Sequence, residues 1–371
     1  MSRSATLLLD DHNGSSENCT VLEAGGNMAQ EPELCNILDP FQGNKSKRRK
    51  LDEEAIKRSV QQNPNAANKE YTFENRLYRQ TCYPLHASII LGWSMDVIKL
   101  LYSAFPQAIQ KKCQIYNQNQ TPLHLACAFR PSSPDIVSFL LQTYPSAVHQ
   151  SDPSDGLLPL HTACLNRASP DIISLLIEKG PMALREKTIF GGSTPLHIAC
   201  AESLPIESLS LLLQQWPGAT REKTCRGQLP LHHACYRCCS VDKIQLLLET
   251  YPRAVFGRDW EGRTPLDCKF IPKETSDLLK IIYSLLDDSI LKKERHAIAT
   301  ECLNTFIQMK WWGGAAIVLD ACPTVKLSVL DDCVKIAPYL LSFVGKRCRL
   351  STMQKLICNR QDLLLVDGLS S

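Results

Sequence analysis

The stretch Thr121-Pro-Leu-His-Leu-Ala-Cys127 decides the fold, because close copies of it recur along the chain at nearly constant spacing. The copies begin at Pro84, Pro122, Pro159, Pro195 and Pro230, and a sixth at Pro265 keeps only Pro-Leu. Successive copies are 38, 37, 36, 35 and 35 residues apart. This series predicts one supersecondary unit stacked about six times, and repeat arrays usually present a binding surface instead of a catalytic centre.

Around each copy, the residue types predict two helices and a loop. Helix one begins at the motif, with Pro in its first turn and a threonine N-cap at Thr121, Thr194 and Thr264. Helix two ends at a Pro-x-Ala turn, since proline cannot continue a helix. The predicted starts of helix two are Ser94, Ser133, Ser169, Leu204, Ser240 and Thr275, and the stops are Pro106, Pro145, Pro181, Pro217 and Pro252.

This unit resembles the ankyrin repeat, whose motif Thr-Pro-Leu-His-x-Ala is carried by Thr121 to Ala126 and by Thr194 to Ala199. The resemblance implies an all-α solenoid of helix-turn-helix units with finger loops, which binds proteins and performs no chemistry. The chain departs from the family pattern in its Cys after the Ala, its Pro-x-Ala turns and its longer early repeats. The outermost copies are degenerate, as is typical of terminal repeats that act as caps.

Composition divides the chain into three regions. Residues 1–75 lack hydrophobic periodicity, so we interpret them as a disordered tail. Residues 76–290 hold the array. We expect residues 291–371 to form a C-terminal helical domain packed on the last repeat, with Trp311-Trp312-Gly313-Gly314 breaking its first helix. The candidate helices span 292–311, 314–321, 326–336, 338–346 and 350–358.

The tail carries a run of four cations, Lys47, Arg48, Arg49 and Lys50. Such a run on an exposed segment resembles a nuclear import signal, since an acidic receptor groove would bind it through charge-assisted contacts. The alternative is an ordinary solvated charge run.

Composition also limits the compartment and the class of partner. The net charge of +3 is too small to argue for nucleic acid by bulk electrostatics. No stretch approaches the roughly 18 apolar residues that span a bilayer, and no signal peptide is recognisable. We therefore expect a soluble protein of the nucleus or cytoplasm, in which the 17 cysteines are reduced thiols.

The motif histidines and cysteines are interpreted as structural. By the resemblance, each histidine hydrogen-bonds the backbone of the loop region and joins neighbouring units; these residues are His86, His124, His161, His197 and His232. Repeats packed ~10 Å apart keep the rings from converging on one atom. The cluster His232-His233-Ala-Cys235-Tyr-Arg-Cys238-Cys239 leaves zinc binding, or a reactive thiol at Cys238 or Cys239, as alternatives. We expect no metal and no cofactor.

A protein partner is expected on the loop tips and on the concave face of helix one, where the resemblance places ankyrin contacts. These positions mix aromatic, polar and cationic residues, as protein interfaces do. The candidate partner-binding residues are Phe129, Asn166, Phe190, Glu202, Arg226, Gln228, Tyr236, Arg237, Trp260 and Arg263.

The function expected is a monomeric, non-catalytic scaffold or adaptor for a protein of unknown identity. One alternative is an adaptor subunit whose C-terminal helices recruit a larger machine such as a ubiquitin ligase. Another is an enzyme with its activity in the C-terminal region, although no phosphate-binding loop, metalloprotease motif or nucleophile elbow occurs. Nucleic-acid binding is weaker still, because acids interleave with the cations of the loops.

Overall fold

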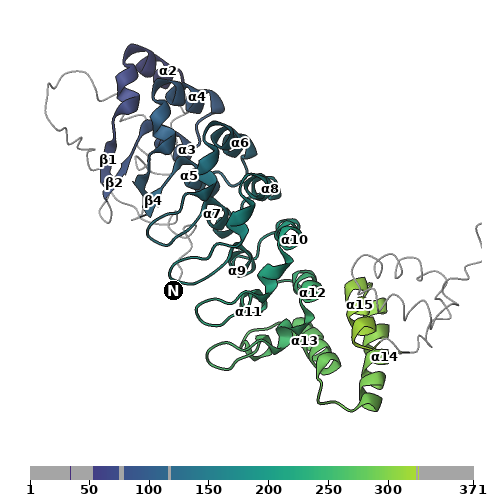
Figure 1. The fold of residues 1–371 in the computed structure, drawn as a ribbon. Helices are drawn as coiled ribbons and strands as arrows, with labels where there is room; N and C mark the ends of the chain where they lie inside the picture. Colours follow the sequence, from purple (N-terminus) through teal and green to yellow (C-terminus); the bar gives the residue numbers. More distant parts are fainter. Residues whose placement is uncertain (1–33, 35–52, 75–78, 116–117, 323–324, 326–371) are drawn as a thin grey trace, which may run out of the picture. The chain divides into compact units, whose positions relative to one another are not determined.

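The computed structural model describes residues 34, 53–74, 79–115, 118–322 and 325 (Figure 1). The chain divides into two compact units, Met1–Ala219 and Thr220–Ser371. Within the described residues, no helix is both long and apolar enough to cross a membrane.

The first unit is built from helix pairs at the predicted positions. The first helices are α3 (Pro84–Leu91), α5 (Pro122–Phe129), α7 (Pro159–Leu165) and α9 (Pro195–Ala201). The second helices are α4 (Met95–Ala104), α6 (Pro134–Thr143), α8 (Pro170–Lys179) and α10 (Ile206–Gln215). The first helices pack against one another in one layer, and α6, α8 and α10 pack in another (Figure 1). The all-α repeat architecture is therefore confirmed.

A tight turn joins the two helices of most pairs. One residue adopts the left-handed conformation, as Gly92 does with φ 81° and Arg167 with φ 55°. The next residue, such as Trp93 or Ala168, is buried between the helices. The serines predicted as N-caps of helix two occupy that position in α4, α6 and α8, but their hydroxyls make no capping hydrogen bond. In α6 and α8 a proline in the first turn favours the start of the helix instead, because its fixed φ angle suits that position.

Short 3-10 helices follow the second helices at the Pro-x-Ala turns. They are η4 (Pro106–Gln110), η5 (Pro145–His149), η6 (Pro181–Leu184), η7 (Pro217–Arg221) and η8 (Pro252–Phe256). The alanine of η4, η5, η6 and η8 is buried, as is the residue after it.

The prediction that residues 1–75 are a disordered tail is wrong for residues 53–74, which the structure describes. Here α2 (Glu53–Gln62) is followed by η3 (Pro64–Asn68), which repeats the Pro-x-Ala turn at Pro64-Asn-Ala66. Ile56 and Val60 form the apolar face of α2 and are buried. Since α2 packs on α4, and Ser94 Oγ donates to Glu53 Oε2 at 2.9 Å, this segment is the second half of an additional repeat.

Four short strands, which the sequence did not predict, lie in the first unit. They are β1 (Tyr71–Glu74), β2 (Arg79–Cys82), β3 (Cys113–Ile115) and β4 (Gln118–Gln120). They form one antiparallel sheet in the order β1-β2-β3-β4, with Thr81 opposite Gln114. The strands belong to the loops before α3 and α5, so the longer early loops pair with each other through backbone hydrogen bonds.

The second unit contains α11 (Pro230–Tyr236), α12 (Val241–Thr250), η9 (Pro265–Asp267), α13 (Lys273–Leu286), α14 (Lys292–Gln308) and α15 (Trp312–Ala321). Helix one of the last motif is reduced to η9. The helix after it starts at Lys273, two residues before the predicted Thr275, which is buried inside it.

The C-terminal helices α14 and α15 pack against α13 and α12 (Figure 1). Trp311 Nε1 donates to Glu249 Oε1 of α12 at 2.8 Å. The predicted break at Trp311-Trp312-Gly313-Gly314 is present but lies earlier, at Met309–Trp311, because Trp312 and both glycines lie inside α15. A side chain at Gly313 would collide with the Glu249 carboxylate, so glycine permits this close approach. The predicted helices at 326–336, 338–346 and 350–358 lie outside the described residues.

Candidate protein-binding surface

The motif histidines link each helix one to the loop that follows the same repeat. In four repeats the ring Nε2 lies within 3.3 Å of a backbone carbonyl oxygen of that loop. The pairs are His86 with Lys111, His124 with Leu157, His161 with Glu186 and His232 with Arg263. Because carbonyl oxygens only accept, Nε2 carries the proton in each of these rings.

The other ring nitrogen completes the start of the helix. Nδ1 of His161 accepts the backbone N–H of Leu158 at 3.2 Å, and Nδ1 of His232 accepts that of Leu229 at 3.0 Å. In the repeat at Thr194, both the backbone N–H and the hydroxyl lie against Nδ1 of His197, at 3.2 and 2.8 Å. The histidine, as the third residue of the helix, therefore supplies its half of a capping box even where leucine replaces threonine, although a leucine side chain cannot accept the reciprocal bond.

Burial keeps these rings neutral. It lowers the pKa of His86, His124 and His161 to about 4, although each backbone carbonyl bond acts in the opposite direction. Burial also lowers the pKa of His232, and that of the neighbouring His233 to about 4. In His124, His161 and His232 both nitrogens of the uncharged ring are bonded, so these rings position the loop and offer no free atom to a substrate.

We call the loops between each Pro-x-Ala turn and the next motif fingers; they are residues 111–121, 150–158, 185–194, 222–229 and 257–264. The finger at 257–264 is held by Asp259. Its Oδ1 accepts the backbone N–H groups of Glu261 and Arg263, both at 2.9 Å, and its Oδ2 accepts the Arg263 guanidinium. Desolvation acts to raise the pKa of Asp259, but these bonds outweigh it and hold the pKa below its usual range.

Trp260 is displayed at the tip of this rigid finger. Its side chain is 76% exposed, while its backbone N–H donates to the Arg226 carbonyl oxygen of the preceding finger at 3.0 Å. Gly227, with φ 74°, lies beneath it, and a Cβ there would stand 3.0 Å from Trp260 Cδ1. The indole is therefore fixed at its base and open to solvent across its face.

The finger at 185–194 presents two neighbouring apolar side chains in the first unit. Ile189 is 60% exposed and Phe190 is 76% exposed. Thr188 closes this finger, since its hydroxyl accepts the Ser193 N–H and its own N–H donates to the Ser193 carbonyl, both at 3.0 Å. The Ile189 N–H donates to the Asp155 carbonyl of the preceding finger at 2.9 Å. This apolar tip is again held by its backbone.

Comparison with known proteins identifies the repeat. A family model for ankyrin repeats in three copies matches residues 132–220. Residues 132–220 are therefore ankyrin repeats. No curated protein sequence matches it. Among solved structures, it is similar to a chain from the Bd0816 predatory endopeptidase of Bdellovibrio bacteriovorus in complex with immunity protein Bd3460, at 20% identity and a TM-score of 0.43. That match covers 52% of this chain and 92% of the other.

The ankyrin array places the predicted partner-binding residues in different environments. Phe190, Arg226, Tyr236, Arg237, Trp260 and Arg263 are exposed. Phe129, Asn166 and Gln228 are half-buried. Asn166 ends α7, where its Nδ2 donates to the Thr162 carbonyl at 2.9 Å. The role of these residues in binding stays a prediction.

The prediction that Glu202 lies on an exposed partner-binding surface is corrected by the structure, because only 8% of this residue is exposed. It ends α9, and its carboxylate lies 4.0 Å from the Arg167 guanidinium of the preceding repeat. Position seven after the motif proline is exposed at Arg237 but buried at Glu202. Exposure at this offset therefore depends on the neighbouring repeat.

Ile189 and Phe270 are among the exposed apolar residues that the sequence did not predict. Ile189 stands beside Phe190, so a two-residue reading of the finger tip would have found it. Phe270 is 76% exposed, although it occupies the position of the buried motif cysteine. Because helix one of that repeat is reduced to η9, the chain leaves the stack before Phe270.

The motif cysteines behave as buried packing residues. Burial raises the pKa of Cys127 to about 12, and it also raises that of Cys164 and Cys235. Cys239 is buried, whereas Cys238 is exposed and its Sγ donates to the Phe270 carbonyl at 2.8 Å. In the part of the chain that the structure describes, no three His, Cys, Asp or Glu side chains are grouped to hold a metal ion.

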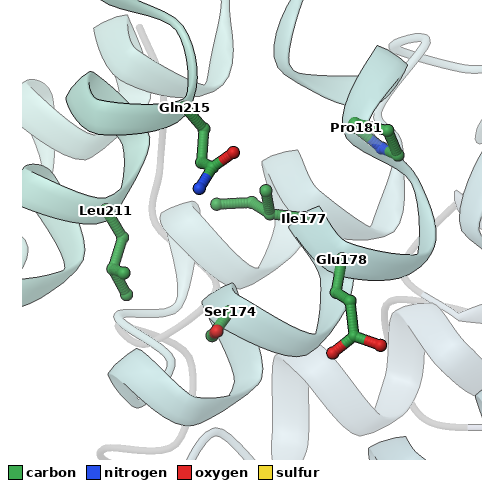
Figure 2. Close-up of a pocket in the computed structure, with 6 residues that line it drawn as sticks. All are labelled: Ser174, Ile177, Glu178, Pro181, Leu211 and Gln215. Carbon is green, nitrogen blue, oxygen red and sulfur yellow. The ribbon is translucent and has the colours of Figure 1, made fainter.

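A shallow hollow of about 360 Å³ lies between α8 and α10 (Figure 2). Ser174, Ile177, Glu178 and Pro181 line one side, and Leu211 and Gln215 line the other. Glu178 is the one ionisable residue among these six, so the lining does not form a catalytic constellation. The candidate import signal, Lys47, Arg48, Arg49 and Lys50, lies outside the described residues.

Proposed function

We propose that this ankyrin array is a non-catalytic scaffold that binds a protein partner through its finger tips. The observation that carries the proposal is Trp260, which is 76% exposed on a finger whose backbone is held by Asp259 and by the preceding finger. A fixed aromatic side chain loses little conformational entropy on binding, and tryptophan is prominent among the residues that dominate interface energies.

The charges around Trp260 indicate the chemistry of the partner. Arg226 and Arg258 are exposed on the same two fingers, and the Arg258 guanidinium bonds the Gly262 carbonyl. Asp259, by contrast, is buried and paired with Arg263. Two arginines are thus exposed on the fingers that carry the indole, while the exposed carboxylate of Glu261 is paired with Arg263 at 2.9 Å. We expect a partner segment that combines an apolar side chain for Trp260 with acidic residues for the arginines.

The experiment is affinity purification of the tagged full chain with quantitative mass spectrometry. We expect Trp260→Ala to reduce recovery of the main bound proteins at least about tenfold, as is typical of an interface hot spot. Met309→Ala is the matched control, since Met309 is also exposed in the second unit but lies after α14, outside the fingers. Thermal unfolding should show both variants folded.

Equal recovery of the bound proteins by wild type and Trp260→Ala would contradict the proposal that the partner binds at this finger tip. The finger at 185–194 is tested in the same way with Phe190→Ala. If neither variant affects recovery while Met309→Ala does, the partner binds elsewhere on the chain.

A further inference from the structure

A cysteine and a histidine that are far apart in the sequence lie in contact in the hairpin formed by α14 and α15, which we call the C-terminal hairpin. His296 lies on the second turn of α14, and Cys322 directly follows the last residue of α15. Cys322 Sγ lies 3.5 Å from His296 Nδ1, within hydrogen-bond range for sulfur. The two residues are 26 positions apart and are brought together by the packing of the two helices.

This environment differs from that of the other cysteine in the same hairpin. Cys322 and His296 are each partly exposed, so a small molecule can approach the sulfur. Cys302 of α14 is buried, and burial raises its pKa to about 12. A thiol becomes a nucleophile only as it loses its proton. An imidazole nitrogen within reach can take that proton during attack, as the base does in cysteine nucleophiles generally.

We propose that Cys322, with His296 as its base, is a thiol modification site that small hydroperoxides oxidise. Cys322 Sγ attacks the terminal oxygen of the hydroperoxide, an S–O bond forms and the O–O bond breaks. The sulfur is oxidised to a sulfenic acid, and the peroxide is reduced. His296 Nδ1 accepts the thiol proton and returns it to the leaving oxygen, which departs as an alcohol, or as water when hydrogen peroxide is the oxidant.

The test treats the folded full chain with hydrogen peroxide at low dose and traps sulfenic acids with dimedone, followed by peptide mass spectrometry. Each cysteine then reports its own rate within one sample. We expect Cys322 to be labelled faster than Cys225, which is exposed on a finger, and Cys302 to remain unlabelled because it is buried. In His296→Gln, labelling of Cys322 should fall at least about tenfold, while that of Cys225 stays unchanged.

Labelling of Cys302 reports whether the His296→Gln variant has opened the hairpin. If it has, the wild-type comparison of Cys322 with Cys225 decides the proposal alone. Equal labelling of these two cysteines in wild type would overturn it. So would a folded His296→Gln variant in which Cys322 reacts at the wild-type rate.

Discussion

At the scale of single residues, the motif histidine performs two tasks that its position in the sequence reveals only in part. Its spacing shows that it repeats, and the resemblance assigns it to the loop backbone. The structure adds that Nδ1 accepts from the start of its own helix while Nε2 donates to the loop. One buried ring therefore fixes a helix end and a finger together.

Replacing His124 with glutamine should destabilise the first unit. The substitution removes the bond to the Leu157 carbonyl, at 3.0 Å, and the contact with the Thr121 hydroxyl, at 2.8 Å. A buried carbonyl left without its donor costs about 1–3 kcal/mol. We expect a loss of about 2 kcal/mol in the free energy of unfolding, measured by urea denaturation. His149→Gln, at an exposed position, should change it little, and equal losses in the two variants would contradict this account.

At the scale of elements, the array begins earlier than the motif suggests. Helix α2 lacks a Pro-Leu-His copy before it, and its region is dominated by polar and charged residues. The remaining signals are an apolar pair four residues apart, Ile56 and Val60, and the Pro-x-Ala turn at Pro64. Applying the Pro-x-Ala rule beyond the motif region would have found this half-repeat.

Truncating the apolar face of α2 should release it from α4. Ile56 is completely buried, and replacing a buried isoleucine with alanine typically costs 2–5 kcal/mol. We expect Ile56→Ala to accelerate hydrogen exchange in α2 and η3 while the exchange of α8 stays unchanged, because repeats contact mainly their neighbours. Gln61→Ala, on the exposed face of the same helix, is the control. Uniform acceleration through both α2 and α8 would argue against an independent terminal half-repeat.

At the scale of the whole chain, the buried histidines couple stability to pH. The pKa of His86, His124 and His161 is about 4 in the folded state and near 6.5 in an unfolded chain. Between these values the unfolded state binds more protons, so acidification favours unfolding. The stabilisation is complete above pH 6.5 and is lost as the pH falls towards 4.

Unfolding by urea at pH 7.5 and pH 5.0 measures this effect. Each of the three histidines contributes at most about 1.4 kcal/mol per pH unit below 6.5, so together we expect a loss of several kcal/mol at pH 5.0. His149→Gln should lose as much as wild type, since His149 is exposed. An equal free energy of unfolding at the two pH values would show that the buried histidines do not dominate the pH dependence of stability.

The sequence by itself determined the repeat, the helix pairs that follow the motif copies from Pro84 to Pro230 and most of their ends, because proline, glycine and the capping residues act on the backbone within a few positions. It also located the fingers, including the exposed tips at Phe190 and Trp260. Only the tertiary structure decided which equivalent positions face solvent, since Glu202 is buried where Arg237 is exposed. The same holds for the packing of α15 on α12 through Trp311 and for the approach of Cys322 to His296. Those contacts join residues whose separation follows no repeat, so local residue preferences carry no information about them.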